Sequence, residues 1–505
     1  MDAVAHGPAS IAALRDAVQK GREPPPAEIV ARLPSYWLFV IGTVCIGAFM
    51  GQVDSSIAQL LLPKLELEFN ARLSTVSWVA VAYLLAMAAF LPIFGRLADM
   101  MGRKLLYTGG FLLFVLSSAL CGLAPSLPVL IAFRVLQGIG AALLSSNSVA
   151  IVVAAAGPAR RGRALGILSA AQAVGTGPAL GGLVLELLDW RWVFWINVPV
   201  GLAGTVLGWF LLPPTKDLPD ESRFDWKGAL LIAPALTALV AMLNEGYAWG
   251  VTSPTLIGCA VLAVILLMLF VHCERRAEAP LVDFSLFRRS AFLTGNIAGL
   301  LSYAALFGLF FLMPFVFVRV YQDSIFSAGL RLSIVPVMLG LVAPVGGALY
   351  DRLGARLLTA SGMLICVIGL ALLFAVMNGT PASLSLVMLA LAIFGVGQGL
   401  FISPNNSAIM AAAPASLTGE AGGLLNVMRS LGISIGVAAA SSLLAWRLAV
   451  LTGSGHNTLA AEGRHLLAAG HDVIILLGGC VAVAGALSLT RTSPRSPRKT
   501  ATQLE

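Results

Sequence analysis

Two short stretches decide the fold: Gly95-Arg96-Leu97-Ala98-Asp99-Met100-Met101-Gly102-Arg103-Lys104 and Gly347-Ala348-Leu349-Tyr350-Asp351-Arg352-Leu353-Gly354-Ala355-Arg356. Both follow the pattern G-x-L-x-D-x-x-G-x-[K/R], and the second begins 252 residues after the first. Each stands at the end of a long apolar segment. A repeat of half a chain's length indicates a duplicated unit. In a membrane protein it is typical of a transporter built from pseudo-symmetric halves.

Each copy predicts a tight turn between two membrane-spanning helices. Gly95 and Gly102 allow backbones to approach closely or to adopt a positive φ. Asp99 can accept hydrogen bonds from the amides that begin the next helix, where negative charge is favoured. Arg103 and Lys104 are expected to hold the turn at an anionic leaflet. The corresponding residues of the second copy are Gly347, Asp351, Gly354 and Arg356.

The composition is that of a polytopic membrane protein. The 505 residues are 58% apolar and only 11% charged, whereas soluble domains carry roughly 25% charged residues. The net charge of +8 therefore indicates contact with anionic lipid, and we expect no nucleic-acid partner. The six cysteines are scattered without metal-ligand spacing, so we expect inert thiols and neither metal site nor cofactor. No cleavable signal peptide is expected at the N-terminus.

Fourteen apolar runs are long enough to span a bilayer, which takes about 20 residues. They lie near 36–62, 75–95, 104–124, 128–155, 163–185, 191–212, 227–247, 253–272, 291–317, 327–350, 356–377, 382–411, 420–446 and 470–490.

The distribution of basic residues predicts the orientation. An even number of spans places both termini on one side, and that side carries 23 Lys and Arg against seven on the other. Both termini and both repeated turns are therefore expected in the cytoplasm. Because the repeated turn follows the second and the tenth spans, two spans have been inserted between six-helix halves. We predict a tail at 1–35, bundles at 36–212 and 290–490, two inserted helices with their linkers at 213–289, and a tail at 491–505.

Asp54 is the one acid that lies well inside a predicted span. It stands nine residues before Pro63, roughly 13 Å inward of the periplasmic end at the helical rise per residue. Ionisable groups at such depth are costly and are functional candidates. Asp54 is interpreted as a reversible proton site, or alternatively as a structural acid bonded to neighbouring helices.

Arg134 of the fourth span lies at a depth similar to that of Asp54, if their two helices are neighbours. An arginine does not deprotonate, so it must be paired or hydrated. It can pair with Asp54, or stabilise it through water, and be released when Asp54 is protonated. The alternative is a fixed structural pair.

Other spans carry polar, aromatic and glycine residues, and each group has two interpretations. Gly177, Pro178, Gly181 and Gly182 of the fifth span suit a bend at a rocking interface, or close packing alone. A further set of side chains is interpreted as contacting the substrate, and the alternative for each is packing between helices. The set is Gln59, Tyr83, Asn147, Gln172, Tyr303, Phe307, Gln398, Asn405, Asn426 and Arg429.

These motifs resemble those of the major facilitator superfamily and, within it, of the fourteen-span drug:proton antiporters. The repeated turn is similar to the family's cytoplasmic motif, with Met100 where a basic residue is usual. The run from Gly177 to Gly182 resembles the antiporter motif, although Ala164 and Ala173 replace its upstream glycines. The run from Asp189 to Pro199 and the run from Asn426 to Gly432 resemble two further motifs of the subfamily.

The resemblance implies an all-α major facilitator fold with 14 helices, arranged as six, two and six. It implies a transporter, not an enzyme, that exports amphipathic drugs or toxic metabolites across the inner membrane in exchange for protons. The alternative is a proton-coupled symporter that imports a small metabolite, and a third class is a non-transporting scaffold. The expected partners are a small amphipathic substrate, protons and membrane lipid. The sequence leaves open whether a periplasmic adaptor protein takes part.

Overall fold

The structure of the chain is a computed structural model. It describes residues 23, 25–157, 160, 164, 167–168, 171–172, 175, 179–215, 225–249, 253–277, 280–414, 417–453 and 462–491. Within these ranges all regular secondary structure is helical, as the sequence predicts.

The helices follow one another along the chain as α2 (Glu28–Ala31), α3 (Tyr36–Glu68), α4 (Leu73–Met101), α5 (Arg103–Gly122), α6 (Leu127–Ala156), α8 (Ala179–Leu187), α9 (Trp192–Trp195), α10 (Asn197–Leu211), α11 (Trp226–Trp249), α12 (Pro254–Glu274), the 3-10 helix η2 (Phe284–Arg288), α13 (Ser290–Phe315), the π-helix η3 (Val316–Val320), α14 (Ile325–Leu332), α15 (Ile334–Val376), the 3-10 helix η4 (Pro381–Ser383), α16 (Leu384–Ala412), α17 (Thr418–Thr452) and α18 (Gly463–Leu489).

Thirteen segments of the described chain are long and apolar enough to cross a membrane. Each coincides with one of the fourteen predicted spans. The remaining one, the fifth at 163–185, is described only in part, and its end forms α8. The sixth predicted span consists of two helices, α9 and α10, which meet at Ile196. The tenth and eleventh are joined into the 43-residue α15, with a break at Gly354.

The two copies of the repeated turn share one backbone feature. Gly102, between α4 and α5, has φ 110°, and Gly354, inside α15, has φ 75°. Glycine adopts these positive φ values without the steric penalty that other residues incur, so the pattern marks a reversal of direction in both halves. Gly95 lies within α4, and a Cβ atom there would have open space around it. Neither a positive φ nor a close backbone approach therefore requires glycine at this position.

The charged end of the first turn is organised differently from the prediction. Lys104 is buried, with 1% of its surface exposed, and so does not face lipid headgroups. Glu23, from the N-terminal segment, accepts a hydrogen bond from the Leu105 amide at 2.8 Å. The Arg103 amide donates to the Thr215 hydroxyl at 2.7 Å. The start of α5 is thus capped by segments from both ends of the first half. The side chains of Asp99 and Asp351 lie outside the described part, so their roles stay predictions.

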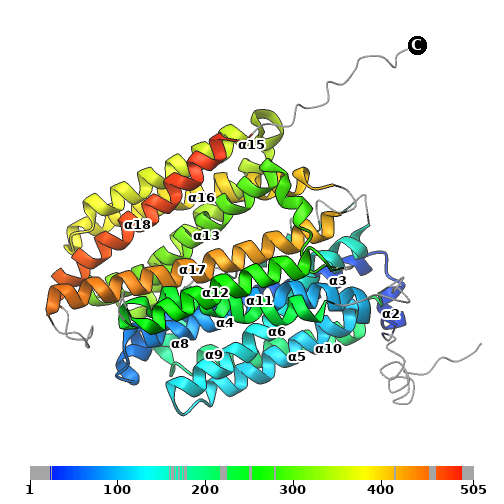
Figure 1. Cartoon of the computed structure of the whole chain (residues 1–505). Helices are drawn as coiled ribbons and strands as arrows, with labels where there is room; N and C mark the ends of the chain where they lie inside the picture. Colours follow the sequence, from blue (N-terminus) through cyan, green and yellow to red (C-terminus); the bar gives the residue numbers. More distant parts are fainter. Residues whose placement is uncertain are drawn as a thin grey trace, which may run out of the picture.

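The spans form two groups with α4 and α17 at the junction between them. Figure 1 shows α4, α5, α6 and α10 together, and α13, α15, α16 and α18 together on the other side. Glycines allow close packing in each group. A Cβ atom at Gly138 of α6 would overlap the Tyr83 carbonyl of α4, and one at Gly436 of α17 would overlap the Ala304 carbonyl of α13. Small residues at such crossings are typical of helix packing in membranes.

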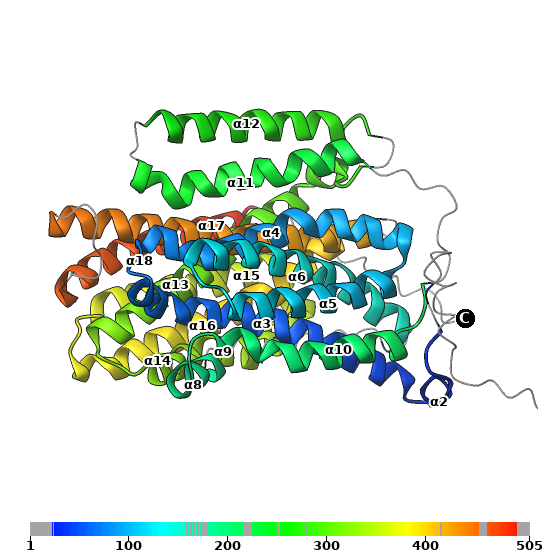
Figure 2. The ribbon, with the colours of Figure 1, turned by 90° about the horizontal axis from the view of Figure 1, so that it is seen from below.

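The inserted helices α11 and α12 form an outer layer beside α4 and α17, with α12 outermost (Figure 2). Asn244 of α11 is fully buried and donates to the Ser74 carbonyl of α4 at 2.9 Å. Its amide oxygen accepts from the Ser77 hydroxyl at 2.8 Å. In the next residue, Glu245, the carboxylate accepts from the Trp78 indole at 2.7 Å. The polar end of the seventh predicted span is therefore its attachment to the first half.

We expect Asn244→Leu to lower the melting temperature of the purified protein in detergent. The substitution removes both hydrogen bonds between Asn244 and α4, each worth about 0.5–1.5 kcal/mol. Thr237→Val is the matched control on α11, because the Thr237 hydroxyl is exposed and bonds only to the Ala233 carbonyl of its own helix. Equal melting temperatures for the two variants would contradict this account of the attachment.

Candidate functional site

Asp54 of α3 and Arg134 of α6 form an ion pair inside the first half, as the comparison of their depths suggested. The Nη1 atom of Arg134 lies 2.5 Å from Oδ2 of Asp54, and both side chains are completely shielded from solvent. Attraction between charges is strong in such surroundings, but each ion has also lost its hydration. The pair therefore depends on further hydrogen bonds from the protein.

Asp54 receives those further hydrogen bonds from two amide side chains. Gln137 of α6 donates to Oδ1 of Asp54 at 2.9 Å, and Asn197, the first residue of α10, donates to the same oxygen at 3.2 Å. Both amides also donate to the hydroxyl of Ser118 on α5, each at 3.2 Å. The carboxylate is thus bonded by three donors from two helices.

Arg134 is held in place by polar and aromatic groups in addition to Asp54. Its Nε atom donates to the Val79 carbonyl of α4 at 2.8 Å, and Nη1 also donates to Gln137 at 2.6 Å. The guanidinium carbon lies 4.2 Å from the centre of the Tyr83 ring and 5.7 Å from that of Phe194. The Nη2 atom is buried without a hydrogen-bond partner. One donor of the arginine is therefore free for another ligand.

This arrangement can link protonation of Asp54 to a change in the positions of the helices. Protonation of Asp54 would remove its charge and one acceptor site, leaving Arg134 as an unpaired buried cation. Such a cation is strongly unfavourable unless it moves or acquires a new partner. Because the five network residues come from α3, α5, α6 and α10, a change in this one charge acts on four helices at once.

Sequence reasoning identified the two charges of this network but not their three polar partners. Gln137 lies three residues after Arg134, a spacing that places both on one helix face. Asn197 belongs to the motif between Asp189 and Pro199, which was recognised without a role for the asparagine. The sequence gives no signal for Ser118, because its place in the network depends on how α5 crosses α6 and α10.

The residues predicted to contact substrate have different surroundings, although Arg429 lies near both Tyr303 and Tyr83. The Tyr83 ring of α4 stacks on the guanidinium of Arg134. Asn147 donates to the Leu143 carbonyl of its own helix at 2.9 Å. Asn405 donates to the Gly295 carbonyl at 3.2 Å and accepts a hydrogen bond from Arg491, which points to packing within the second half.

Two predicted contacts retain unused hydrogen-bonding groups. Gln59 of α3 is fully buried, and neither atom of its amide has a partner. Gln398 of α16 accepts from Ser302 at 2.7 Å, but its amide nitrogen has none. Buried polar groups are rarely left unpaired, because this costs about 1–3 kcal/mol. These amides are available to a ligand.

The other residues predicted to contact substrate belong to helices of the second half, except Gln172 of the fifth span. Arg429 of α17 is stacked on Tyr303 of α13, with 5.6 Å between the guanidinium carbon and the ring centre. Phe307 is buried against Phe310, at 5.5 Å between ring centres. Asn426 and Gln172 are half-buried.

The end of the fifth span approaches the other half of the molecule. A Cβ atom on Gly182 of α8 would lie 3.0 Å from the Ile325 carbonyl of α14, and one on Gly181 would overlap Ile57 of α3. Both glycines therefore permit close backbone packing. Gly177 and Pro178, the other two residues of the predicted motif, lie outside the described residues.

Known proteins share both the sequence pattern and the fold. The family profile of the Major Facilitator Superfamily matches residues 44–437. The riboflavin transporter RibZ of Clostridioides difficile (strain 630) is 35% identical over 418 residues, which are 82% of this chain and 89% of RibZ. Multidrug resistance protein Stp of Mycobacterium tuberculosis (strain H37Rv) is 35% identical over 413 residues, covering 80% and 76% of the two chains.

Among solved structures, a bacterial homolog of the human lysosomal transporter Spinster superimposes with a TM-score of 0.63 at 15% sequence identity, covering 90% of this chain and 97% of the homolog. The repeated turns, the helical architecture and these matches agree with one another. The chain belongs to the Major Facilitator Superfamily of membrane transporters.

Proposed function

We propose that the protein exports amphipathic compounds from the cytoplasm in exchange for protons, with Asp54 as the proton carrier. The observation that supports this most directly is the buried ion pair of Asp54 with Arg134, set within membrane-spanning helices. An isolated acid at this depth would be costly, so its presence argues for a functional role. We further propose that both termini and both repeated turns lie in the cytoplasm.

We propose that proton binding and substrate binding favour opposite states of one conformational equilibrium. The deprotonated carboxylate keeps Arg134 paired and favours the state that binds substrate. Protonation releases Arg134 and favours the opposite facing state. A ligand shifts such an equilibrium only through its different affinities for the two states. The unused amides of Gln59 and Gln398, one in each half, are the proposed polar contacts of the substrate.

Export is preferred over import because the fifth span resembles the antiporter motif and the relatives include multidrug resistance proteins. Import of a metabolite is the second candidate, and the similarity to a riboflavin transporter supports it. Both candidates use the same coupling site. The direction of proton-driven accumulation separates them.

The contacts between the halves support a state closed at the predicted periplasmic end. Arg319, beyond α13, pairs with the fully buried Glu66 of α3 at 2.6 Å. The Phe326 amide of α14 donates to Glu186 of α8 at 2.9 Å. Alternating access would require these bonds between the halves to break when the periplasmic end opens.

Asp54→Asn is expected to abolish proton-coupled efflux while the protein remains folded in the membrane, because the amide carries no proton between states. The assay is accumulation of amphipathic dyes in a host that lacks its own pumps, with and without a protonophore. Asp189→Asn is the matched control, since Asp189 is exposed and its ion pair among the described residues is with the nearby Arg191. Parent-level efflux by Asp54→Asn that a protonophore still collapses would show that the proton uses another residue.

A reducible crosslink between the halves should stop transport reversibly. In the double variant Glu66→Cys with Arg319→Cys, crosslinking by a bifunctional thiol reagent with a disulfide in its spacer would hold the periplasmic end shut, because the spacer covers a longer distance than a direct disulfide. Reduction of the spacer would restore transport to the level measured before crosslinking. Asp323→Cys with Arg331→Cys is the control, because this ion pair, at 3.1 Å, lies within the second half. Undiminished transport by the crosslinked first variant would contradict opening at this end.

A further inference from the structure

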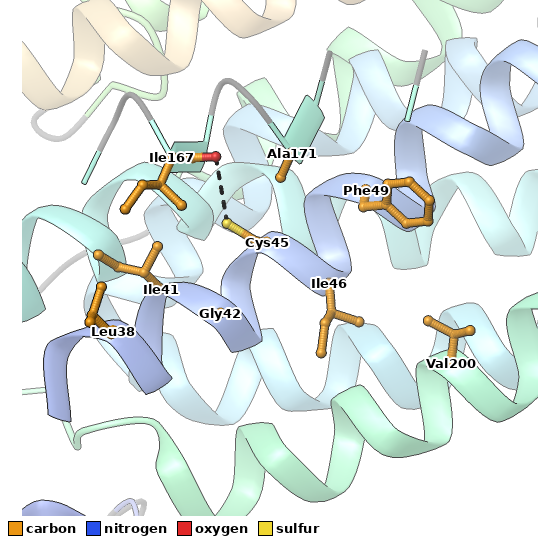
Figure 3. A pocket seen from close by; sticks show the side chains of 9 residues that line it. All are labelled: Leu38, Ile41, Gly42, Cys45, Ile46, Phe49, Ile167, Ala171 and Val200. Carbon is orange, nitrogen blue, oxygen red and sulfur yellow. Dashed lines mark hydrogen bonds between the residues drawn. The ribbon is translucent and has the colours of Figure 1, made fainter. Parts of the chain in front are cut away.

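An apolar groove lies on the outer flank of the first half, between α3, the fifth span and α10 (Figure 3). Its volume is about 520 Å³, and it is lined by Leu38, Ile41, Gly42, Cys45, Ile46, Phe49, Ile167, Ala171 and Val200. Cys45 is the one lining residue with a polar side chain, and its thiol donates to the Ile167 carbonyl at 3.9 Å. The groove therefore suits a hydrocarbon chain and offers nothing to a polar ligand.

The length of the groove matches one leaflet of a bilayer. Figure 3 shows Leu38 at one end and Phe49 with Val200 at the other. Leu38 and Phe49 are eleven residues apart on α3, which corresponds to about 16 Å of helix. Half of a hydrocarbon core of about 30 Å is nearly the same length. An extended acyl chain of one leaflet can thus occupy the groove from end to end.

Positive charge stands at the end of the groove where a headgroup would lie. The guanidinium carbon of Arg160 is 5.3 Å from the centre of the Trp37 ring, and Trp37 directly precedes Leu38. Arg160 is exposed, so it can meet a ligand from the membrane surface. In the sequence it begins the run Arg160-Arg161-Gly162-Arg163, on the predicted cytoplasmic side. Basic residues beside such grooves attract anionic lipid headgroups.

We propose that this groove is a binding site for an anionic phospholipid of the cytoplasmic leaflet. One acyl chain lies along α3 from Leu38 to Phe49, and the phosphate group lies beside Arg160. The combination of an apolar groove of leaflet length with a cationic end selects a lipid over a compact amphipathic substrate. The groove ends five residues before Asp54 on the same helix, so the lipid contacts the helix that carries the proposed proton site.

The site can be tested on the full-length protein by native mass spectrometry after incubation with phosphatidylglycerol or phosphatidylcholine. The parent protein should retain phosphatidylglycerol in preference to phosphatidylcholine. Arg160→Gln should weaken retention of phosphatidylglycerol about fivefold, the effect of one basic residue at an anionic surface, with little effect on phosphatidylcholine. Arg288→Gln is the matched control, since Arg288 is exposed and lies on the same predicted side.

A second variant tests the hydrocarbon end without disturbing the packing of the helix. A Cβ atom on Gly42 meets nothing within 4 Å, so a side chain can begin there freely, and Gly42→Phe is chosen to occupy the groove. It should reduce retention of both lipids. Gly258→Phe on α12 is the control, because Gly258 is exposed and has equally open surroundings. All variants should elute as the parent does on size exclusion.

Two results would overturn the proposal. Equal loss of lipid in Gly42→Phe and Gly258→Phe would show only the general lipid layer around the protein. Unchanged lipid retention in Gly42→Phe, together with reduced transport of a dye, would assign the groove to substrate. Because lipid retention is measured without transport, its outcome is independent of whether the protein proves to be a proton-coupled exporter.

Discussion

A charge buried in a membrane protein requires a counter-charge, and the first half of this molecule is built around that requirement. Asp54 and Arg134 are both fully shielded, and each would be strongly destabilising without the other. Gln137 and Asn197 donate to Asp54 and also to the Ser118 hydroxyl, so that four helices meet at this network. The helices therefore cannot move past one another without changing the partners of a charge. The buried ion pair thus helps to fix the relative positions of these helices, a role that the burial of apolar side chains has in soluble proteins.

The described part of the second half shows no fully buried ion pair of this kind, although it repeats the helical scaffold. Glycine replaces the arginine at Gly395, while Gln398 stands where Gln137 stands in the first half. Gln398 accepts one hydrogen bond from Ser302 and leaves its amide nitrogen unused. The duplicated units have thus diverged in chemistry. Among the described residues, the first half holds a fully buried charge pair, whereas the second half presents the Gln398 amide and the cationic side chains of Arg429 and Arg491. This difference suits separate sites for the coupling ion and the substrate.

Much of the fold could be predicted from the sequence, because span length and the repeated turn depend on local composition. The motif indicated either a close backbone approach or a positive φ at its glycines, and Gly102 and Gly354 have the positive φ. The pairing of Asp54 with Arg134 could be anticipated because depth along a helix is counted in residues. The partners supplied by other helices could not, since they depend on rotation and crossing angle. The same limit explains why Lys104, expected at the lipid surface, is buried instead.

The attachment of α11 has a consequence for how the chain enters the membrane. Asn244 and Glu245 make the end of this helix a poor candidate for independent insertion into lipid. Their hydrogen-bond partners on α4 belong to a part of the chain that is synthesised earlier. A finished first half therefore offers the late-emerging helix a polar surface inside the bilayer. Insertion of α11 therefore depends on prior assembly of the half whose α4 binds Asn244 and Glu245.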